Sequence, residues 1–109
     1  MVTTVAGVMG VSGSTLTTLN YPIGIAIDPQ TRSLYIADYY NRCIRMLTQA
    51  AMQLSSTPAM SFFASHASVS CLRGVAVDSS GNVYFTDVCS HLVFVATSSG
   101  VVSNNLFKL

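Results

Sequence analysis

The residues best suited to chemistry in this chain are two histidines, three cysteines and four aspartates. His66 and His91 lie on different connecting segments, and neither has a neighbour at helical or hairpin spacing with which to share a metal ion. A catalytic zinc ion usually draws three ligands from the protein. The spacing therefore favours solvated loop histidines, and it predicts neither a metal site nor a cofactor.

The aspartates form two sets that alternate along the chain, and all four are predicted to be structural. Asp28 and Asp78 each follow one apolar run, whereas Asp38 and Asp87 end the next run. In an antiparallel sheet the two sets lie at opposite edges, so acid/base chemistry between them is not expected. Asp38 and Asp87 are predicted to cap their turns, because a carboxylate at a strand end accepts backbone N–H groups.

The three cysteines leave two redox states open. Cys71 and Cys89 fall within one place of facing each other across the second predicted hairpin, so an exported protein could join them in a disulfide. Cys43 would then remain buried in its strand. The alternative, which the sequence favours, is three free thiols in a cytosolic protein.

Tyrosine and arginine side chains are the best candidates for binding, because both are enriched in the hot spots of protein interfaces. They lie, with one Asn and one His, in or beside predicted connecting loops, where binding residues concentrate on a rigid scaffold. The candidate set is Tyr21, Tyr39, Tyr40, Asn41, Arg42, Arg73 and His91. An alternative is that Tyr39 and Tyr40 only cover the ends of the sheets, and the sequence does not decide between the two.

The elements that must position these residues are predicted to be strands. Apolar residues come in short runs rich in Val, Ile, Tyr and Phe, bounded by Gly, Asn, Asp, Ser and Pro. Segment Thr48–Ser56 is expected to be a polar connector rather than a helical turn. The expected strands are Val2–Ala6, Ile23–Asp28, Leu34–Ala37, Cys43–Leu47, Ser61–Ala64, Gly74–Asp78, Val83–Thr86, Leu92–Ala96 and Val101–Ser103.

One pattern occurs twice in the chain. Tyr21-Pro-Ile-Gly-Ile-Ala-Ile-Asp28 and Leu34-Tyr-Ile-Ala-Asp38 return as Leu72-Arg-Gly-Val-Ala-Val-Asp78 and Val83-Tyr-Phe-Thr-Asp87. Each copy is predicted to be an antiparallel meander of about four strands, and repeated four-stranded sheets are the blades of a β-propeller. The predicted fold is all-β: a partial β-propeller of roughly two four-stranded antiparallel blades plus flanking strands.

Within each blade, the matching residues have structural explanations. Gly24 and Gly74 are expected where a strand enters a crowded axis, because a residue without Cβ lets two backbones approach. Both faces of these first strands are apolar, which indicates burial between neighbouring sheets. Alternate connections of a meander share an edge, so the loops that carry the candidate binding residues are predicted to lie together.

The first copy resembles an NHL repeat. That family's blade reads Pro-x-Gly-apolar-Ala-apolar-Asp, then apolar-Tyr-apolar-Ala-Asp-x-x-Asn-x-Arg-Ile, and Tyr21–Asp28 with Leu34–Arg45 follows it with the Arg loosely placed. The second copy departs after Asp87, where Ser90-His91-Leu92-Val93 replaces Asn-x-Arg-Ile. The resemblance implies one partial propeller over 1–109. It comprises an outer strand and connector at 1–18, a first blade at 19–65 and a second blade at 66–109.

Composition indicates that the chain needs neighbours. Half of its residues are hydrophobic and 8% are charged, whereas about a quarter are charged in typical soluble domains. The longest apolar run, Leu92–Ala96, is far shorter than the roughly 20 residues of a membrane helix, so no membrane insertion is expected. Two blades cannot close a propeller. The predicted partners are therefore further blades of the same protein, further copies in a homo-oligomer, or another protein.

The predicted function is a non-enzymatic protein-interaction scaffold that uses the Tyr/Arg loop edge. The first alternative is part of a metal-dependent lyase or hydrolase whose site needs further blades, as the resemblance to propeller enzymes implies. The second is RNA binding, which a formal net charge of +1 disfavours. The sequence does not indicate a compartment.

Overall fold

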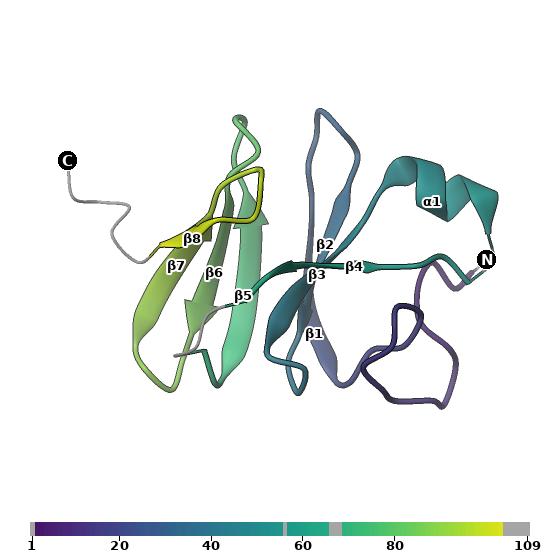
Figure 1. The fold of residues 1–109 in the computed structure, drawn as a ribbon, viewed down its shortest axis with the longest axis horizontal. Helices are drawn as coiled ribbons and strands as arrows, with labels where there is room; N and C mark the ends of the chain where they lie inside the picture. Colours follow the sequence, from purple (N-terminus) through teal and green to yellow (C-terminus); the bar gives the residue numbers. More distant parts are fainter. Residues whose placement is uncertain (1, 56, 66–68, 104–109) are drawn as a thin grey trace.

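The computed structural model describes residues 2–55, 57–65 and 69–103, and eight strands form the framework of this part of the chain. They make two four-stranded antiparallel sheets, each in simple sequence order (Figure 1). The first sheet holds β1 (Pro22–Ile27), β2 (Leu34–Asp38), β3 (Cys43–Leu47) and β4 (Ser61–Ala64). The second sheet holds β5 (Leu72–Val77), β6 (Val83–Asp87), β7 (Leu92–Ala96) and β8 (Val102–Ser103). The prediction of two antiparallel meanders is confirmed.

Each sheet begins with a hairpin that an aspartate organises. In the first, the Asp28 carboxylate accepts the N–H groups of Gln30 and Thr31, at 2.9 and 3.3 Å. In the second, Asp78 accepts the N–H groups of Ser80 and Asn82, both at 2.9 Å. A side chain that bonds to the backbone two residues on is the usual device for starting a tight turn. These two aspartates therefore act at the edge opposite the tyrosine loops.

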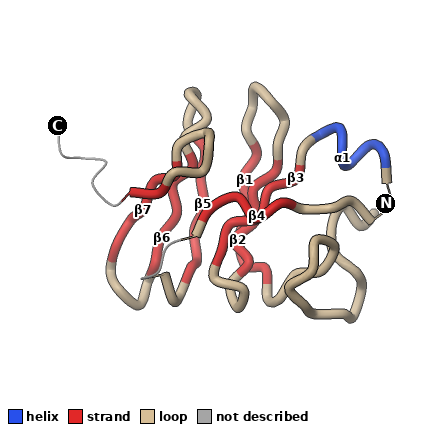
Figure 2. Tube along the Cα trace, in the orientation of Figure 1, coloured by secondary structure: helices blue, strands red, loops and turns tan. Residues whose placement is uncertain are grey.

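The hydrophobic core lies mainly between the two sheets. β1 and β2 of the first sheet pack against β5 of the second, and Figure 2 shows the two layers of strands side by side. A Cβ placed on Gly24 would lie 2.8 Å from the backbone oxygen of Arg73, so only glycine allows this approach. The buried apolar side chains of this core are Tyr35, Ala37, Ile44, Ala64, Val69, Leu72, Val83, Phe85, Phe94 and Ala96.

Two sequence predictions are wrong. Segment Thr48–Ser56 contains a short helix, α1 (Gln49–Leu54), rather than an irregular connector. Its sequence is Gln-Ala-Ala-Met-Gln-Leu, all good helix formers, and the Thr48 side chain caps it by accepting the Ala51 N–H at 3.2 Å. Val2–Ala6 forms no strand. The physical reason is that a strand needs a hydrogen-bonded neighbour, and the blade to which Val2–Ala6 was assigned is not among the described residues.

The first sheet has different surroundings on its two faces. Figure 1 shows the second sheet on one side of it, with α1 and the N-terminal loops on the other. Ile36, Leu47 and Met60 form a smaller core on that other side, against Leu19 and α1 residues such as Met52. In the part of the chain that the structure describes, no helix has the length and hydrophobicity to cross a membrane.

Replacing Phe85 tests the core between the sheets. Its ring is 1% exposed and stacks on Phe94 with centroids 5.4 Å apart. Phe85→Ala is expected to lower the free energy of unfolding by about 3–5 kcal/mol, because it leaves a cavity as well as removing contacts. Urea denaturation measures this, with Leu54→Ala (85% exposed) as the control. A loss no larger than that of the control would contradict this description of the core.

Candidate functional site

The predicted loop edge is formed by direct hydrogen bonds between loops. The N–H of Tyr39 donates to the carbonyl of Tyr21 at 3.2 Å, and the N–H of Tyr40 donates to that of Asn20 at 3.1 Å. In the second sheet the N–H of Val88 donates to the carbonyl of Cys71 at 3.1 Å. The segment before the first strand of each sheet is thus tied to the turn after the second strand.

Three tyrosines form a cluster on this edge. The ring centroids of Tyr21 and Tyr40 lie 5.3 Å apart, those of Tyr39 and Tyr40 5.1 Å, and those of Tyr21 and Tyr39 5.8 Å. Edge-to-face contacts at such distances are the favoured geometry of aromatic pairs. Tyr21 and Tyr40 nevertheless remain 60% and 61% exposed. The cluster is therefore fixed by its own contacts and still presents two ring surfaces to solvent.

The cluster borders a small hollow that an arginine shares. The hollow has a volume of about 210 Å³ and is lined by Tyr21, Ile23, Tyr39, Tyr40 and Arg73. Arg73 comes from β5, so the hollow spans the junction between the two sheets. Its lining offers aromatic surface for apolar contact and one guanidinium for a carboxylate.

The other candidate residues have different positions. The Asn41 side chain is turned inward, where its amide donates to Gly13 O at 2.9 Å and to Asp38 Oδ2 at 2.7 Å. Arg42 and His91 occupy the same turn position in the two sheets, with positive φ of 55° and 61°. Neither lines the tyrosine hollow. His66 lies outside the described residues.

Tyr21 also has a strained backbone. Its φ is 62°, in the left-handed region that costs a residue with a side chain about 1–2 kcal/mol. Cys71, at the same position of the second sheet, is not among the residues with positive φ. Strain that occurs in one repeat only is not required by the fold, and such strain clusters at functional sites.

A buried ion pair supports the tyrosine loops, and it is the main feature that the sequence analysis missed. Arg45 and Asp38 are both fully buried, with Nη1 and Oδ2 3.1 Å apart. The guanidinium also donates to three carbonyls, those of Thr18 at 3.1 Å, Thr15 at 2.7 Å and Met60 at 3.3 Å. Its remaining nitrogen, Nε, has no partner among the described residues. Arg45 thus links the connector before β1 to the strands that carry the cluster.

Asp38 transmits this support to the edge itself. Its Oδ1 accepts the N–H of Asn20 at 2.8 Å, one residue before Tyr21. Its Oδ2 accepts the Asn41 amide, one residue after Tyr40. The strand register explains how the pair meets: Arg45 pairs with Ile36 across β2 and β3, and side-chain alternation puts Ile36 and Asp38 on one face.

The second sheet lacks the arginine but retains the aspartate. Phe94 takes the place of Arg45, because it pairs with Phe85 as Arg45 pairs with Ile36. Asp87 accepts the N–H groups of Ser70, Cys71 and Cys89, each at 3.1 Å. Burial alone would raise the pKa of Asp87, but these N–H groups, with the Ser90 side chain, outweigh it and hold the pKa below its usual value.

Comparison with known proteins identifies the first sheet. The family model described as NHL repeat matches residues 19–46. Residues 19–46 are an NHL repeat. No curated protein sequence matches the chain. Among solved structures, a gluconolactonase from Xanthomonas campestris superposes with a TM-score of 0.62 and 21% sequence identity over 80% of this chain. The two sheets are thus blades of a partial β-propeller, and the likeness covers 28% of the gluconolactonase.

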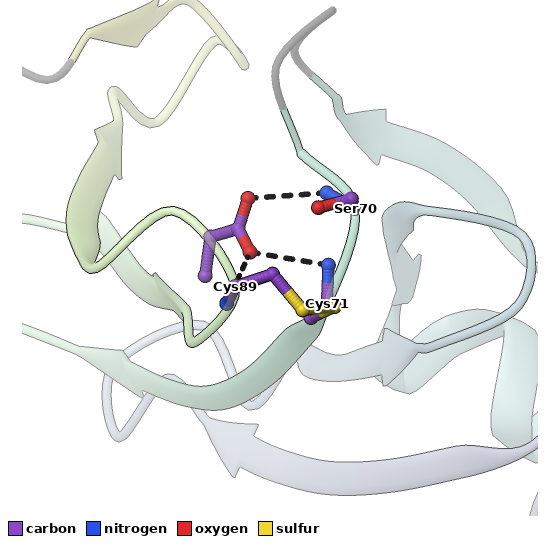
Figure 3. Close-up of a disulfide and its surroundings, with 4 residues drawn as sticks. Ser70, Cys71 and Cys89 are labelled. Carbon is purple, nitrogen blue, oxygen red and sulfur yellow. Dashed lines mark hydrogen bonds between the residues drawn. A yellow bond between two sulfur atoms is a disulfide. The ribbon is translucent and has the colours of Figure 1, made fainter.

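The second blade uses a disulfide where the NHL blade uses tyrosines. Cys71 and Cys89 are joined, with Cα atoms 5.4 Å apart, and they occupy the repeat positions of Tyr21 and Tyr40 (Figure 3). Cys43 is a free, buried thiol. Burial raises its pKa to about 11, with Asp38 adding to the effect and Arg45 opposing it. The structure therefore has the disulfide state, not the three free thiols that the sequence favoured.

The disulfide also accounts for a potential cluster of metal ligands. Ligand atoms of Cys71, Asp87 and Cys89 lie within 4.8 Å of one another. Both sulfur atoms are joined to each other, however, and the Asp87 oxygens accept backbone N–H groups. These groups already close the second blade, so they are not available as ligands to a metal ion.

Matched amide substitutions test the buried ion pair. Asp38→Asn is expected to lower the free energy of unfolding by about 3–5 kcal/mol, because it leaves Arg45 buried without a countercharge. Asp87→Asn, at the same position of the second blade, removes only charge-assisted hydrogen bonds and should cost about 1–2 kcal/mol. Urea denaturation of both variants gives the comparison. Equal losses would show that Arg45 does not depend on Asp38.

Removing the disulfide should lower the free energy of unfolding of the chain. Its cysteines are 18 residues apart, and a closed loop near this length stabilises by about 3 kcal/mol. The double variant Cys71→Ser/Cys89→Ser is expected to lose about 2–4 kcal/mol in chemical denaturation. A dithiol should destabilise the original chain and leave the double variant unchanged. If the dithiol affects neither, the two cysteines are not bonded in solution.

Proposed function

We propose that this chain is a non-enzymatic propeller segment that binds a partner protein through the loop edge of its NHL blade. The observation that carries the proposal is the tyrosine cluster, in which Tyr21 and Tyr40 are held by mutual ring contacts and are still about three-fifths exposed. Soluble proteins normally bury large aromatic surfaces, and exposed patches of this kind mark interaction sites.

The residue types favour a protein ligand. Tyrosine supplies a large contact area at low entropic cost, and here the rings already pack against each other in T-shaped contacts. Arg73 can pair with a carboxylate of the partner. The partner segment is therefore expected to offer an apolar or aromatic side chain next to an acidic one.

The size of the hollow supports the same choice. Its volume is about 210 Å³, whereas pockets for small molecules are usually about 300–1,000 Å³. A space of this size accommodates one side chain better than a whole substrate. We therefore assign it as an anchor point within a larger and flatter contact.

One observation favours a second candidate function. One solved structure that resembles this fold is a gluconolactonase, so a propeller containing these blades could be an enzyme. The first strands of the blades, which pack together between the sheets, present Gly, Ala and aliphatic residues apart from Arg73. Catalytic groups would then have to come from other blades. The protein-binding proposal does not depend on them.

The RNA-binding alternative has less support. Of the arginines, Arg45 is fully buried in its ion pair, which leaves Arg42 and Arg73 near the tyrosines. Two cations contribute little electrostatic attraction compared with a nucleic-acid interface that makes roughly six to ten phosphate contacts. The experiment below includes RNA as a contrary outcome.

Selection from a displayed peptide library tests the proposal. Peptides retained by the chain should lose about tenfold or more in affinity for Tyr40→Ala and for Arg73→Ala, as expected for hot-spot residues. Val88→Ala is the matched control, because Val88 is the exposed residue at the position of Tyr39 in the second blade. Its affinity should be unchanged.

Two outcomes would contradict the proposal. One is a set of peptides whose affinity is insensitive to both substitutions but is lost in a variant elsewhere on the chain. The other is retention of single-stranded RNA that weakens steeply with salt and depends on Tyr40, which would instead assign the edge to nucleic acid.

A further inference from the structure

Each blade has one sheet face that the other blade does not cover. On the first blade this face carries Ile25 and Ile27, which are 68% and 49% exposed. They line an apolar groove of about 680 Å³, which Ala6, Leu19 and Met52 of the same chain also line. On the second blade the uncovered face includes an exposed Ala76 and Val93, the latter 49% exposed.

The contact between the two blades shows what such faces pack against. On the first-blade side, β1 and β2 present small or flat residues, and Gly24 permits the close approach of β5. On the second-blade side, β5 and β6 present bulkier apolar residues. The first set is Gly24, Ala26, Tyr35 and Ala37, and the second is Val75, Val77, Val83 and Phe85.

The two uncovered faces repeat this pair of surfaces residue by residue. The uncovered face of the second blade has the small and flat pattern, at the repeat positions of the first set: Gly74, Ala76, Tyr84 and Thr86. The face of the first blade that points away from the second blade has the bulky pattern, at the repeat positions of the second set: Ile25, Ile27, Leu34 and Ile36. Of these, Ile25 and Ile27 are exposed, whereas Ile36 is already buried against side chains of the same chain such as Leu19. The two faces are therefore complementary to each other in the same sense as the existing interface.

We propose that a second copy of this chain covers these faces. The small-residue face of one copy packs on the bulky face of the next, which continues the interface between the two blades of a single chain. In this contact, Ala76 of one copy would lie against Ile25 and Ile27 of its neighbour. This contact is head-to-tail, so each copy uses two different surfaces and both are covered only when the ring closes.

The geometry of propellers limits the number of copies. Closed propellers usually contain about four to eight blades, so a ring of two-blade chains holds roughly two to four copies. Closure also removes the exposed apolar faces that would otherwise cause aggregation. Charge does not oppose the assembly, because the formal net charge of each copy is only +1.

Two single variants and their mixture test the proposal by light scattering after size-exclusion chromatography. The original chain should elute as a closed assembly of roughly two to four copies. Ile25→Asp and Ala76→Asp each place a charge on one exposed face, and each variant alone should be a single copy. Val88→Asp, on the loop edge away from both faces, is the control and should assemble as the original chain does. A circular dichroism melt verifies that every variant is folded.

The mixture distinguishes a head-to-tail contact from other contacts. Ile25→Asp keeps the small-residue face intact, and Ala76→Asp keeps the bulky face intact, so mixing them should restore one interface and give a one-to-one dimer that grows no further. Three results would overturn the proposal: an original chain that is a soluble single copy, association of Ala76→Asp with itself, or no dimer in the mixture of folded variants.

Discussion

The buried ion pair of Arg45 with Asp38 is the interaction on which the NHL blade depends. A buried guanidinium is costly unless its charge is paired and most of its donors are bonded. Here one carboxylate and three backbone carbonyls pair the charge and bind both Nη groups, and they come from widely separated segments. The same carboxylate fixes the residues on either side of the tyrosine loops. The ion pair therefore couples the stability of the blade to the geometry of its candidate binding edge.

The two blades close the same edge with different chemistry. The first uses the ion pair and the ring contacts of Tyr21 and Tyr40, whereas the second uses hydrogen bonds to Asp87 and the Cys71–Cys89 disulfide. A disulfide holds two loops together without presenting aromatic surface. The divergence between the repeats therefore separates a blade whose edge presents aromatic surface to solvent from one that is covalently closed.

Much of the fold could be predicted from the sequence because the signals are local. Alternating apolar runs, hairpin aspartates and the repeat itself each depend on residues a few places apart. The role of Arg45 could not be predicted, because it depends on carbonyls of distant segments that only the folded chain brings together. The prediction of a strand at Val2–Ala6 is wrong for the opposite reason. Its local pattern suits a strand, but a strand also needs a hydrogen-bonded neighbour. At the site, the tyrosines were recognised by type, whereas the inward turn of Asn41 follows from tertiary contacts alone.

The buried thiol of Cys43 has a consequence for oxidative folding. Thiol–disulfide exchange requires a thiolate, and a pKa of about 11 leaves roughly one thiol in ten thousand ionised at neutral pH. In the folded first blade, Cys43 is both protonated and enclosed, so it cannot attack the Cys71–Cys89 bond. A first blade that folds early would hide the one competing thiol before the second pairs its cysteines. Burial of a single strand residue thus protects the chain against disulfide scrambling.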